Sequence, residues 1–384
     1  MKRIVILGGG VGGVIAAREL SRRLRGRSEI TLIDKEARHH FPPSYPWLAM
    51  GWREPAQLWR PLSDLRAPGV KIRQETVLAI DPKARAVTTS EGSLAYDFLL
   101  MALGAELQPS AIEGLGAIAH HTYDLESAVR LRDALREFRG GRVLVGVSRL
   151  PFKCPAAPYE MALLMDHEFR RRGIRDRVDF SFFTPEPHPV PAAGAAIGKE
   201  VEGLLVARGI EFHAKREIDH VEPEGRTVHF KAGAAETFDL LVAVPPHSTS
   251  AAVRTSDLAK DGPWVPVDPY TMRTAYDDIY AVGDVTKIPT PAGHVPFLPK
   301  AGVFAHGQAT VAARNIAAAI LGETGARWDG HGVCFLEVGG GKAGMVRGNF
   351  YGGEGPAVRM RGPGRISHLG KVMLERRWLR RHFR

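Results

Sequence analysis

The sequence predicts an α/β protein with two Rossmann-like domains, the first of them discontinuous, and a C-terminal segment that carries a basic amphipathic helix. The chain has 384 residues, which is enough for two domains of ordinary size. Apolar runs alternate with helical patterns near the start of the chain and again from residue 142 onward, as is typical of parallel strands covered by helices. Residues 365–384 combine apolar residues at helical spacing with many arginines.

The elements of the first unit follow one another closely. A strand, a helix and a second strand are predicted at residues 3–7, 14–24 and 30–33. Residues 70–89 and 94–103 alternate apolar and polar side chains with period two, and Pro82 and Gly92 interrupt them. We expect a small antiparallel excursion there, followed by a strand that returns to the first sheet.

A second pattern of strands and helices fills the middle of the chain. Strands are predicted at residues 142–147, 178–183 and 240–244, and helices at residues 157–172 and 198–208. A proline-rich stretch after residue 257 leads to a strand at 279–282 and a long helix at 302–321. The expected limits are 1–110 and 250–325 for the first domain, 111–249 for the second and 326–384 for the C-terminal segment.

The composition excludes several classes of protein. The two cysteines, Cys154 and Cys334, are too few for a disulfide-stapled secreted scaffold or a zinc cluster, so no metal site is expected and a single redox pair remains open. The first apolar run is too short for a signal-peptide core, and no later stretch reaches ~18 apolar residues. We therefore expect a cytoplasmic protein that does not span a membrane.

The net charge of +10 is concentrated at one end of the chain. Residues 359–384 hold nine Lys and Arg against one acidic residue, which accounts for +8 of that charge. A basic terminus of this kind serves a membrane, a protein partner or a nucleic acid. Because the rest of the chain carries only +2, a broad electrostatic footprint for nucleic acid is absent and none is expected as a partner.

A glycine motif follows the first strand. Gly8, Gly10 and Gly13 satisfy G-x-G-x-x-G at a helix start, and Asp34 closes the next strand. The glycines let the backbone approach a pyrophosphate at the helix N-terminus, while the carboxylate accepts hydrogen bonds from a ribose. The pattern predicts a dinucleotide site, and the alternative is a tight strand-to-helix turn without a ligand.

Two later segments distinguish between dinucleotides. Residues 98–104, which end in Gly104, and residues 279–284, which end in Gly283 and Asp284, resemble the paired return strands of flavoproteins with two dinucleotide-binding domains. This resemblance implies FAD as the cofactor, with Asp284 at its ribityl or pyrophosphate part. The alternative for each segment is a strand followed by a common turn.

The second unit lacks a comparable glycine loop. Its first strand contains Gly146 alone, and bulky residues and prolines follow where a pyrophosphate needs bare backbone. NADH binding is therefore disfavoured.

Four segments resemble sulfide:quinone oxidoreductase and its relative, the flavoprotein of flavocytochrome c sulfide dehydrogenase. They are residues 41–53, 153–160, 184–187 and 298–302, and the likeness extends over nearly the whole chain. The resemblance implies an FAD-dependent enzyme that oxidises sulfide and reduces a quinone, and a homo-oligomer is expected. Pro43 and Gly302 lie in matching segments and are assigned to the cofactor site on that ground.

The family also implies roles for four side chains. Cys154 and Cys334 are similar to the two redox cysteines beside the flavin, Glu160 to an acidic residue proposed as a proton acceptor, and Lys300 to a residue near the flavin pyrimidine edge. Cys154 follows Lys153 and precedes a helix, which favours its thiolate, and Glu160 lies one to two helical turns further on. The alternative is two unrelated buried thiols.

Two departures from the family pattern leave residue roles open. A third cysteine is common in these enzymes after the first return strand, but residues 105–141 contain none and offer His120 and His121 instead. A family histidine expected after Glu186 is not matched cleanly, because His188 lies several residues early. Each of these histidines is either a site residue or a solvated surface group.

The basic tail predicts a helix with one apolar face formed by Leu369, Val372, Leu379 and Phe383. A helix of this kind can lie in an anionic membrane interface, which suits an enzyme that delivers electrons to a quinone. Docking on its own protein or on a dimer partner is the alternative.

The expected reaction begins with attack of HS⁻ on a Cys154–Cys334 disulfide. The alternative activities are a type-II NADH:quinone oxidoreductase, a sulfide dehydrogenase that donates to a cytochrome, and a non-catalytic flavoprotein with a basic binding tail. A second glycine loop would favour the first of these, and dispensable cysteines would favour the last.

Overall fold

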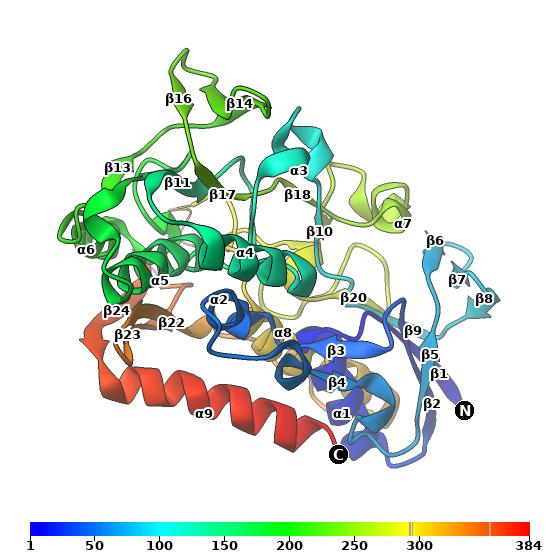
Figure 1. The fold of residues 1–384 in the computed structure, drawn as a ribbon. Helices are drawn as coiled ribbons and strands as arrows, with labels where there is room; N and C mark the ends of the chain where they lie inside the picture. The colour runs from blue at the N-terminus through cyan, green and yellow to red at the C-terminus, as the bar shows by residue number, and fades with distance from the viewer. Residues whose placement is uncertain (292, 294, 353–354) are drawn as a thin grey trace.

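The computed structural model describes residues 1–291, 293, 295–352 and 355–384. Two parallel sheets flanked by helices lie next to each other, and a three-stranded antiparallel sheet with a long terminal helix completes the molecule (Figure 1). The mixed α/β class predicted from the sequence is confirmed.

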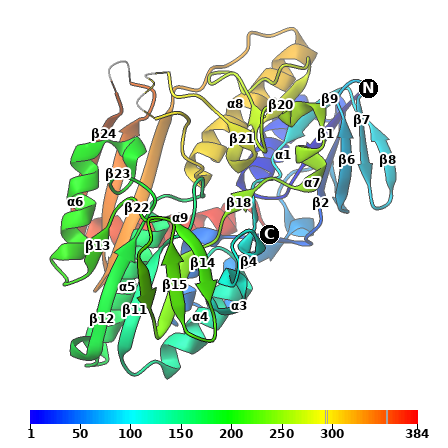
Figure 2. The same ribbon diagram turned by 90° about the horizontal axis from the view of Figure 1, so that it is seen from above.

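The first sheet is parallel throughout and has the strand order β20-β9-β1-β2-β5. Its strands are β1 (Lys2–Leu7), β2 (Ser28–Asp34), β5 (Val70–Gln74), β9 (Phe98–Met101) and β20 (Ile279–Ala281). Helices α1 (Val11–Leu24) and α8 (Gly302–Leu321) pack on each other beside it (Figure 2). Because β20 and α8 come from much later in the chain, this unit is discontinuous, as predicted.

The antiparallel excursion begins later than the sequence pattern indicated. Residues 70–74 form β5, which pairs in parallel with β2 so that Val70 lies beside Ile30. The antiparallel sheet consists of β6 (Val77–Asp81), β7 (Ala86–Thr89) and β8 (Gly92–Ala95). Period-two alternation reports one-sided burial but not the direction of the neighbouring strand, so it did not separate β5 from β6.

The second sheet is also parallel, with the strand order β13-β12-β11-β17. Its strands are β11 (Gly141–Val147), β12 (Val178–Phe183), β13 (Glu211–His213) and β17 (Leu240–Val244), and its helices are α4 (Leu125–Glu137), α5 (Ala157–Arg171) and α6 (Ala195–Val206). Helix α4 was not predicted, although Asp124 caps it by accepting a hydrogen bond from the Ser127 N–H at 2.7 Å.

Short elements connect these units. The short helices are α2 (Tyr45–Ala49), α3 (Leu115–Ile118) and α7 (Ala251–Arg254). The paired short strands are β3 (Arg38–His40) with β4 (Trp59–Pro61), β10 (Glu106–Leu107) with β18 (His247–Ser248), and β19 (Val265–Pro266) with β21 (Thr286–Lys287). An outer antiparallel sheet contains β14 (Ile218–Glu222), β15 (Thr227–Phe230) and β16 (Ala235–Thr237).

The C-terminal segment bridges both units. Its strands β22 (His331–Gly339), β23 (Lys342–Asn349) and β24 (Ala357–Gly364) form an antiparallel sheet, and the chain ends in α9 (Arg365–His382). Strand β22 packs against α5 of the second unit and α8 of the first, and α9 packs along β23. Among the described residues no helix is both long and apolar enough to cross a membrane.

The predicted apolar face of α9 is wrong in part. Leu379 and Phe383 are buried, but Leu369 is 58% exposed. The face of α9 that packs inward is largely polar and includes Lys371 and Glu375. Ser44 donates a hydrogen bond to Glu375, and Glu160 accepts one from Lys371. Helical spacing alone does not reveal these partners, because they come from other elements.

Candidate functional site

Three glycines shape the loop between β1 and α1. Gly8 has a φ of +101°, a Cβ on it would strike the carbonyl of Ala102, and a Cβ on Gly13 would strike the carbonyl of Gly8. At Gly10, the N-cap of α1, a Cβ would meet nothing within 4 Å in the described parts of the chain. The N–H groups at a helix start lack intrahelical partners and attract anions, so this open space fits a pyrophosphate.

Asp34 supports the same loop from the end of β2. Its Oδ2 accepts a hydrogen bond from the Gly9 N–H at 2.5 Å, and its Oδ1 accepts one from the Glu36 N–H at 2.7 Å. Burial raises the pKa of its carboxyl, and the two backbone donors oppose that shift. The loop-fixing contact with Gly9 was not foreseen, and the carboxylate retains acceptor capacity for a ribose hydroxyl.

Asp284 follows β20 and supplies an unsatisfied acceptor. Its Oδ1 is buried and has no hydrogen-bond partner among the residues that the structure describes. Burial raises the pKa of this carboxyl, while Lys153 and Lys300 lower it. A buried carboxylate oxygen without a donor costs free energy, so a ligand hydroxyl at this place would be stabilising.

Lys300 connects the Asp284 region to Cys154. Its Nζ donates to the carbonyls of Asp284 and Thr286, at 2.8 Å each, and lies 3.4 Å from the centroid of the Trp264 ring. Burial lowers the pKa of this ammonium group to about 7. The Lys300 carbonyl accepts a hydrogen bond from the Cys154 N–H at 2.7 Å, which places the cysteine loop beside the start of α8.

The other predicted cofactor residues lie at element ends of the first unit. Gly104 follows β9 with a φ of +69°, and Gly283 follows β20 with a φ of +73°. Gly302 begins α8, where a Cβ would lie 3.8 Å from Val11 beside the glycine loop. Pro43 is an exposed residue of the turn that precedes α2.

The two cysteines occupy neighbouring elements. Cys154 lies in the loop before α5 with a φ of +54°, and Cys334 lies on β22. Both are free thiols, and each is affected by the charges of the same pair, Glu160 and Lys371. A non-glycine residue held at positive φ is strained, and such strain clusters at functional sites.

The expected thiolate character of Cys154 is wrong for this structure. Burial raises the pKa of the Cys154 thiol far above its ordinary value, and the charges of Cys334 and Glu160 raise it further. Burial likewise raises the pKa of Cys334 to about 11. Local sequence showed an adjacent lysine and a helix start, but α5 begins only at Ala157 and desolvation outweighs both effects.

Glu160 lies in the first turn of α5 and is almost completely buried. Its Oε1 accepts a hydrogen bond from Lys371 Nζ, and its Oε2 accepts one from the Glu337 N–H at 3.2 Å. Burial raises the pKa of Glu160, and Lys371 opposes this shift. The structure thus brings Glu160 together with both cysteines and with α9.

Lys371 and its neighbours on α9 were missed as site residues. Lys371 Nζ lies 4.7 Å from the centroid of the Trp47 ring, and His368 Nδ1 lies 2.9 Å from an oxygen of the fully buried Glu337. The available signal was spacing, because residues 368, 371 and 375 share one helical face. The sequence interpretation treated these residues as part of a solvated basic tail and therefore did not predict that this face is buried.

The histidines left open by the sequence lie in different surroundings. Burial lowers the pKa of His121 to about 4, and its Nε2 lies 3.4 Å from Ser127 Oγ. The neighbouring His120 is bridged through its backbone to Val242 of β17. The His188 Nδ1 lies 3.0 Å from the Pro189 carbonyl, and its ring lies beside Gly198 of α6.

His247 and Tyr123 border the cysteine site and were not predicted. Their rings are 5.4 Å apart in an edge arrangement, and the Tyr123 hydroxyl donates to the Cys154 carbonyl at 3.5 Å. Burial lowers the pKa of His247 to about 3. His247 is therefore a neutral group beside the cysteine loop.

In the second unit, Gly146 and Glu186 have different surroundings from the glycine loop and Asp34 of the first unit. A Cβ on Gly146 would strike Phe183, so this glycine serves strand packing. Asp34 is the last residue of β2, whereas Glu186 lies three residues beyond the end of β12. Glu186 is buried and accepts a hydrogen bond from the Tyr159 hydroxyl at 3.0 Å. Burial raises its pKa to about 7. The hydrogen-bond partner of this carboxyl is therefore a side chain of the protein, Tyr159.

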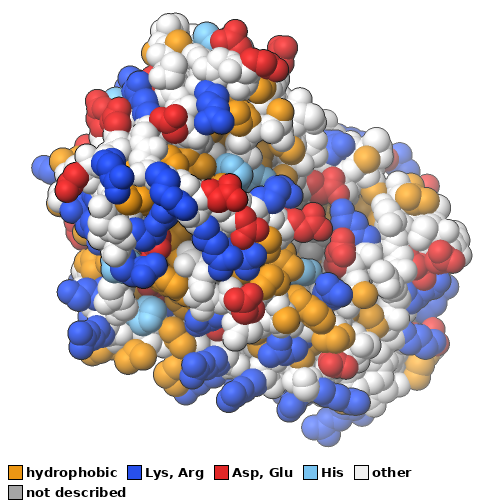
Figure 3. Space-filling view, in the orientation of Figure 1, with side chains coloured by type: hydrophobic (Ala, Val, Ile, Leu, Met, Phe, Trp, Pro, Cys, Tyr) orange, Lys and Arg blue, Asp and Glu red, His pale blue; other side chains and the backbone are white. Residues whose placement is uncertain are grey.

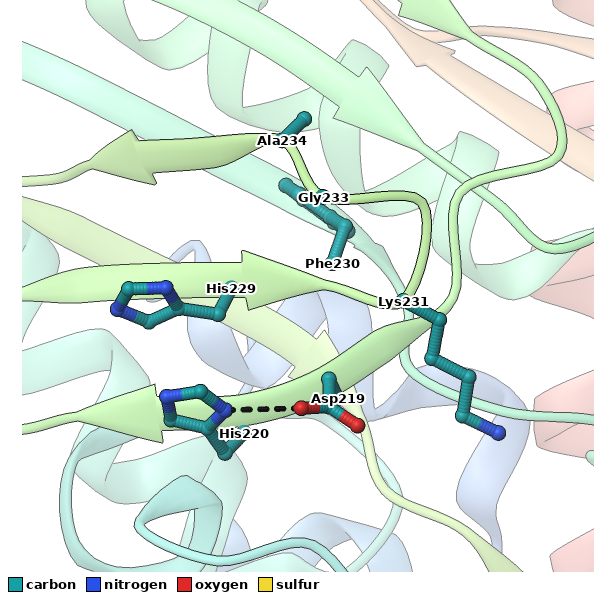
Figure 4. A pocket seen from close by; sticks show the side chains of 7 residues that line it. All are labelled: Asp219, His220, His229, Phe230, Lys231, Gly233 and Ala234. Carbon is teal, nitrogen blue, oxygen red and sulfur yellow. Dashed lines mark hydrogen bonds and ion pairs between the residues drawn. The ribbon is translucent and has the colours of Figure 1, made fainter.

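A shallow hollow on the outer sheet contains none of these residues. It is lined by Asp219, His220, His229, Phe230, Lys231, Gly233 and Ala234, and the two histidine rings stack with centroids 4.2 Å apart (Figure 4). Within the described residues, no group of three His, Cys, Asp or Glu side chains is placed to hold a metal ion.

Comparison with known proteins identifies the family. Residues 2–312 match the pyridine nucleotide-disulphide oxidoreductase family. The sulfide-quinone reductase of Aquifex aeolicus is 31% identical over 332 residues, which cover 82% of this chain and 76% of that protein. The chain belongs to the sulfide:quinone oxidoreductase family.

Two further matches support and delimit this assignment. The X-ray structure of the Aquifex aeolicus sulfide:quinone oxidoreductase superposes with a TM-score of 0.86 and 27% identity, covering 98% of this chain and 90% of that one. A type II NADH:quinone oxidoreductase of Staphylococcus aureus is 24% identical, with 84% of each chain covered.

As a member of this family, the protein is a flavin-dependent oxidoreductase with FAD as its cofactor. The residues present fit that group. The open space at Gly10 suits a pyrophosphate, and the unpartnered Asp284 Oδ1 suits a hydroxyl of the cofactor.

The contrast between Gly10 and Gly13 gives a test of the loop. We expect Gly10→Ala to leave folding intact, because its Cβ has free space, but to raise the Kd for FAD about 10-fold or more by entering the pyrophosphate space. Gly13→Ala is expected to lower the free energy of unfolding by about 1–3 kcal/mol even without FAD, because its Cβ strikes a backbone carbonyl.

FAD fluorescence titration and thermal unfolding of the FAD-free protein measure these two effects. Equal FAD affinity in the Gly10→Ala variant and the wild type would show that the pyrophosphate does not occupy this space.

Proposed function

We propose that the protein oxidises sulfide through a Cys154–Cys334 redox pair and passes the electrons by way of FAD to a quinone. The observation that supports this most is the common environment of the two thiols, since each is affected by the buried Glu160–Lys371 pair. The backbone of Cys154 is also bonded to Lys300, whose Nζ reaches Asp284 at the cofactor site.

The first step is thiol–disulfide exchange. HS⁻ attacks one sulfur of the oxidised pair, a new S–S bond forms, the Cys154–Cys334 bond breaks and the other cysteine leaves as a thiolate. Sulfide sulfur is thereby oxidised and the disulfide is reduced. FAD, when bound, would be held by the glycine loop and Asp284 and would supply the two-electron acceptor between the reduced cysteine pair and the quinone.

The residues around the cysteines set the conditions for this exchange. The persulfide proton passes to the Glu160 carboxylate, which burial makes more basic than an exposed carboxylate. Lys371 holds that carboxylate in place and compensates its charge while it is ionised. Because burial raises the pKa of both thiols, the cysteine sulfur that leaves is a strong base, and Glu160 can return the proton to it.

The decisive experiment compares two reductants. We expect anaerobic sulfide to bleach the visible flavin absorption of the purified holoenzyme and NADH to leave it unchanged over the same time. Rapid bleaching by NADH without bleaching by sulfide would favour the type-II NADH:quinone oxidoreductase. The segment after β11 has no second G-x-G-x-x-G motif, and Glu186 is already bonded to Tyr159, which argues against that alternative.

The outer face of α9 favours a quinone in a membrane as the electron acceptor. Ile366, Leu369, Met373 and Leu374 are exposed there. Lys and Arg side chains gather with hydrophobic ones along the lower edge of the molecule, over α9 (Figure 3). We propose that this face associates peripherally with an anionic membrane on the cytoplasmic side.

Liposome binding tests this association. We expect Ile366→Ser/Leu369→Ser to weaken co-sedimentation with anionic liposomes about 10-fold or more, since each large apolar side chain contributes about 1 kcal/mol at an interface. Leu78→Ser/Val206→Ser is the matched control, because those side chains are similarly exposed on other elements. Equal loss in both variants, or no binding by the wild type at low salt, would contradict the proposal.

A further inference from the structure

His39 connects the cofactor loop to the C-terminal helix. The Trp378 Nε1–H donates to His39 Nε2 at 2.9 Å, and His39 Nδ1 lies 2.8 Å from the Gly9 carbonyl. The indole nitrogen is only a donor, so Nε2 is the acceptor and Nδ1 carries the proton that Gly9 accepts. His39 is 1% exposed, and burial lowers its pKa to about 4, which keeps it neutral in this tautomer.

The bond to Gly9 determines the orientation of one peptide group in the cofactor loop. The Gly9 carbonyl and the Gly10 N–H belong to the same planar trans peptide and point in opposite directions. Asp34 already holds the Gly9 N–H on the preceding peptide. The loop is therefore fixed on both sides of Gly9, and His39 controls the peptide that ends at the N-cap of α1.

Other contacts fasten the end of α9 without involving this loop. Arg66 donates from its Nε to the Phe383 carbonyl and from its N–H to the His382 carbonyl, at 2.8 Å each. Arg384 donates from its N–H to the Asp64 carbonyl at 3.0 Å. The bond from Trp378 to His39, by contrast, continues through a hydrogen bond to the glycine loop.

We propose that His39 is a positioning residue that couples FAD binding to the docking of α9. Bound FAD holds the Gly9–Gly10 peptide in the orientation in which its carbonyl accepts from His39. Docked α9 holds the His39 ring in place through the hydrogen bond from Trp378. Coupling between two sites is reciprocal, so loss of FAD loosens α9 to the same extent that undocking of α9 weakens FAD binding.

The first measurement uses the wild-type protein. Hydrogen exchange is followed for the amides of residues 366–382 with FAD bound and after FAD has been removed. We expect FAD to slow exchange across this helix, although α9 does not belong to the glycine loop. Identical exchange of α9 in the two forms would overturn the proposal.

The second measurement uses Trp378→Phe, which keeps an aromatic ring against His39 but removes the indole donor. We expect its Kd for FAD to rise about 3- to 10-fold, which corresponds to the loss of one hydrogen bond. The effect of FAD on α9 exchange is expected to shrink in this variant.

The matched control is Arg66→Ala, which removes one hydrogen bond to the Phe383 carbonyl at the end of the same helix and leaves the Trp378–His39 bond in place. It is expected to speed α9 exchange equally with and without FAD and to keep the wild-type Kd. A Trp378→Phe variant that behaves in the same way would assign Trp378 a purely structural role and overturn the coupling.

Discussion

Replacement of Cys154 or Cys334 with serine is expected to abolish flavin reduction by sulfide while FAD stays bound. A hydroxyl cannot form the S–S bond that the exchange requires, so we expect the rate of anaerobic bleaching to fall by about 10³-fold or more. Dithionite should still reduce the flavin, because that reaction does not need the cysteines. Stopped-flow spectroscopy of each variant measures both rates.

Val333→Ala is the matched control for the Cys334 variant, since Val333 is the adjacent residue of β22. It is expected to retain the wild-type rate. Normal turnover of either cysteine variant with sulfide would refute the redox pair and would favour the interpretation of the thiols as unrelated buried residues.

Lys371→Met is expected to lower the free energy of unfolding by about 3–5 kcal/mol. The substitution leaves the Glu160 carboxylate buried without its ammonium partner. Removing one partner of a buried ion pair lowers the free energy of unfolding more than replacing both partners does. The double variant Glu160→Gln/Lys371→Met should recover much of the loss. Lys231→Met, which breaks the exposed pair with Glu217, is the control and should cost less than about 1 kcal/mol.

The loss in Lys371→Met should also depend on pH. Burial already raises the pKa of Glu160 above 4.5, and removal of Lys371 raises it further. A carboxyl with a raised pKa in the folded state binds a proton on folding, so its cost is absent at low pH and grows as the pH rises through that pKa. Thermal unfolding should therefore show a smaller deficit near about pH 5 than near about pH 8. An equal deficit at both would contradict the buried-charge explanation.

Local patterns predicted the elements that depend on local sequence. Helix α8 was predicted with its observed bounds, and the strands at residues 178–183 and 240–244 were likewise predicted with theirs. Each has a continuous apolar or helical pattern with clear ends. The position of the glycine loop followed from the same kind of evidence.

The surroundings of the candidate site depended on contacts that local sequence does not contain. Lys371 is 211 positions from Glu160, and nothing in a run of basic residues distinguishes a buried lysine from a solvated one. Cys154 illustrates the same point, because its desolvation comes from the surrounding fold and reverses the expectation drawn from its neighbours in sequence. Leu369 faces outward for the related reason that polar partners, not apolar ones, cover the inner face of α9.

The late position of β20 in the chain has a consequence for the order of folding during synthesis. The strands of the second sheet all lie between residues 141 and 244, so that sheet is complete once this stretch has left the ribosome. The first sheet, although it starts at residue 2, has to wait for residues 279–281. The nascent β1, β2, β5 and β9 therefore have an open edge at β9 while the whole middle unit is being made.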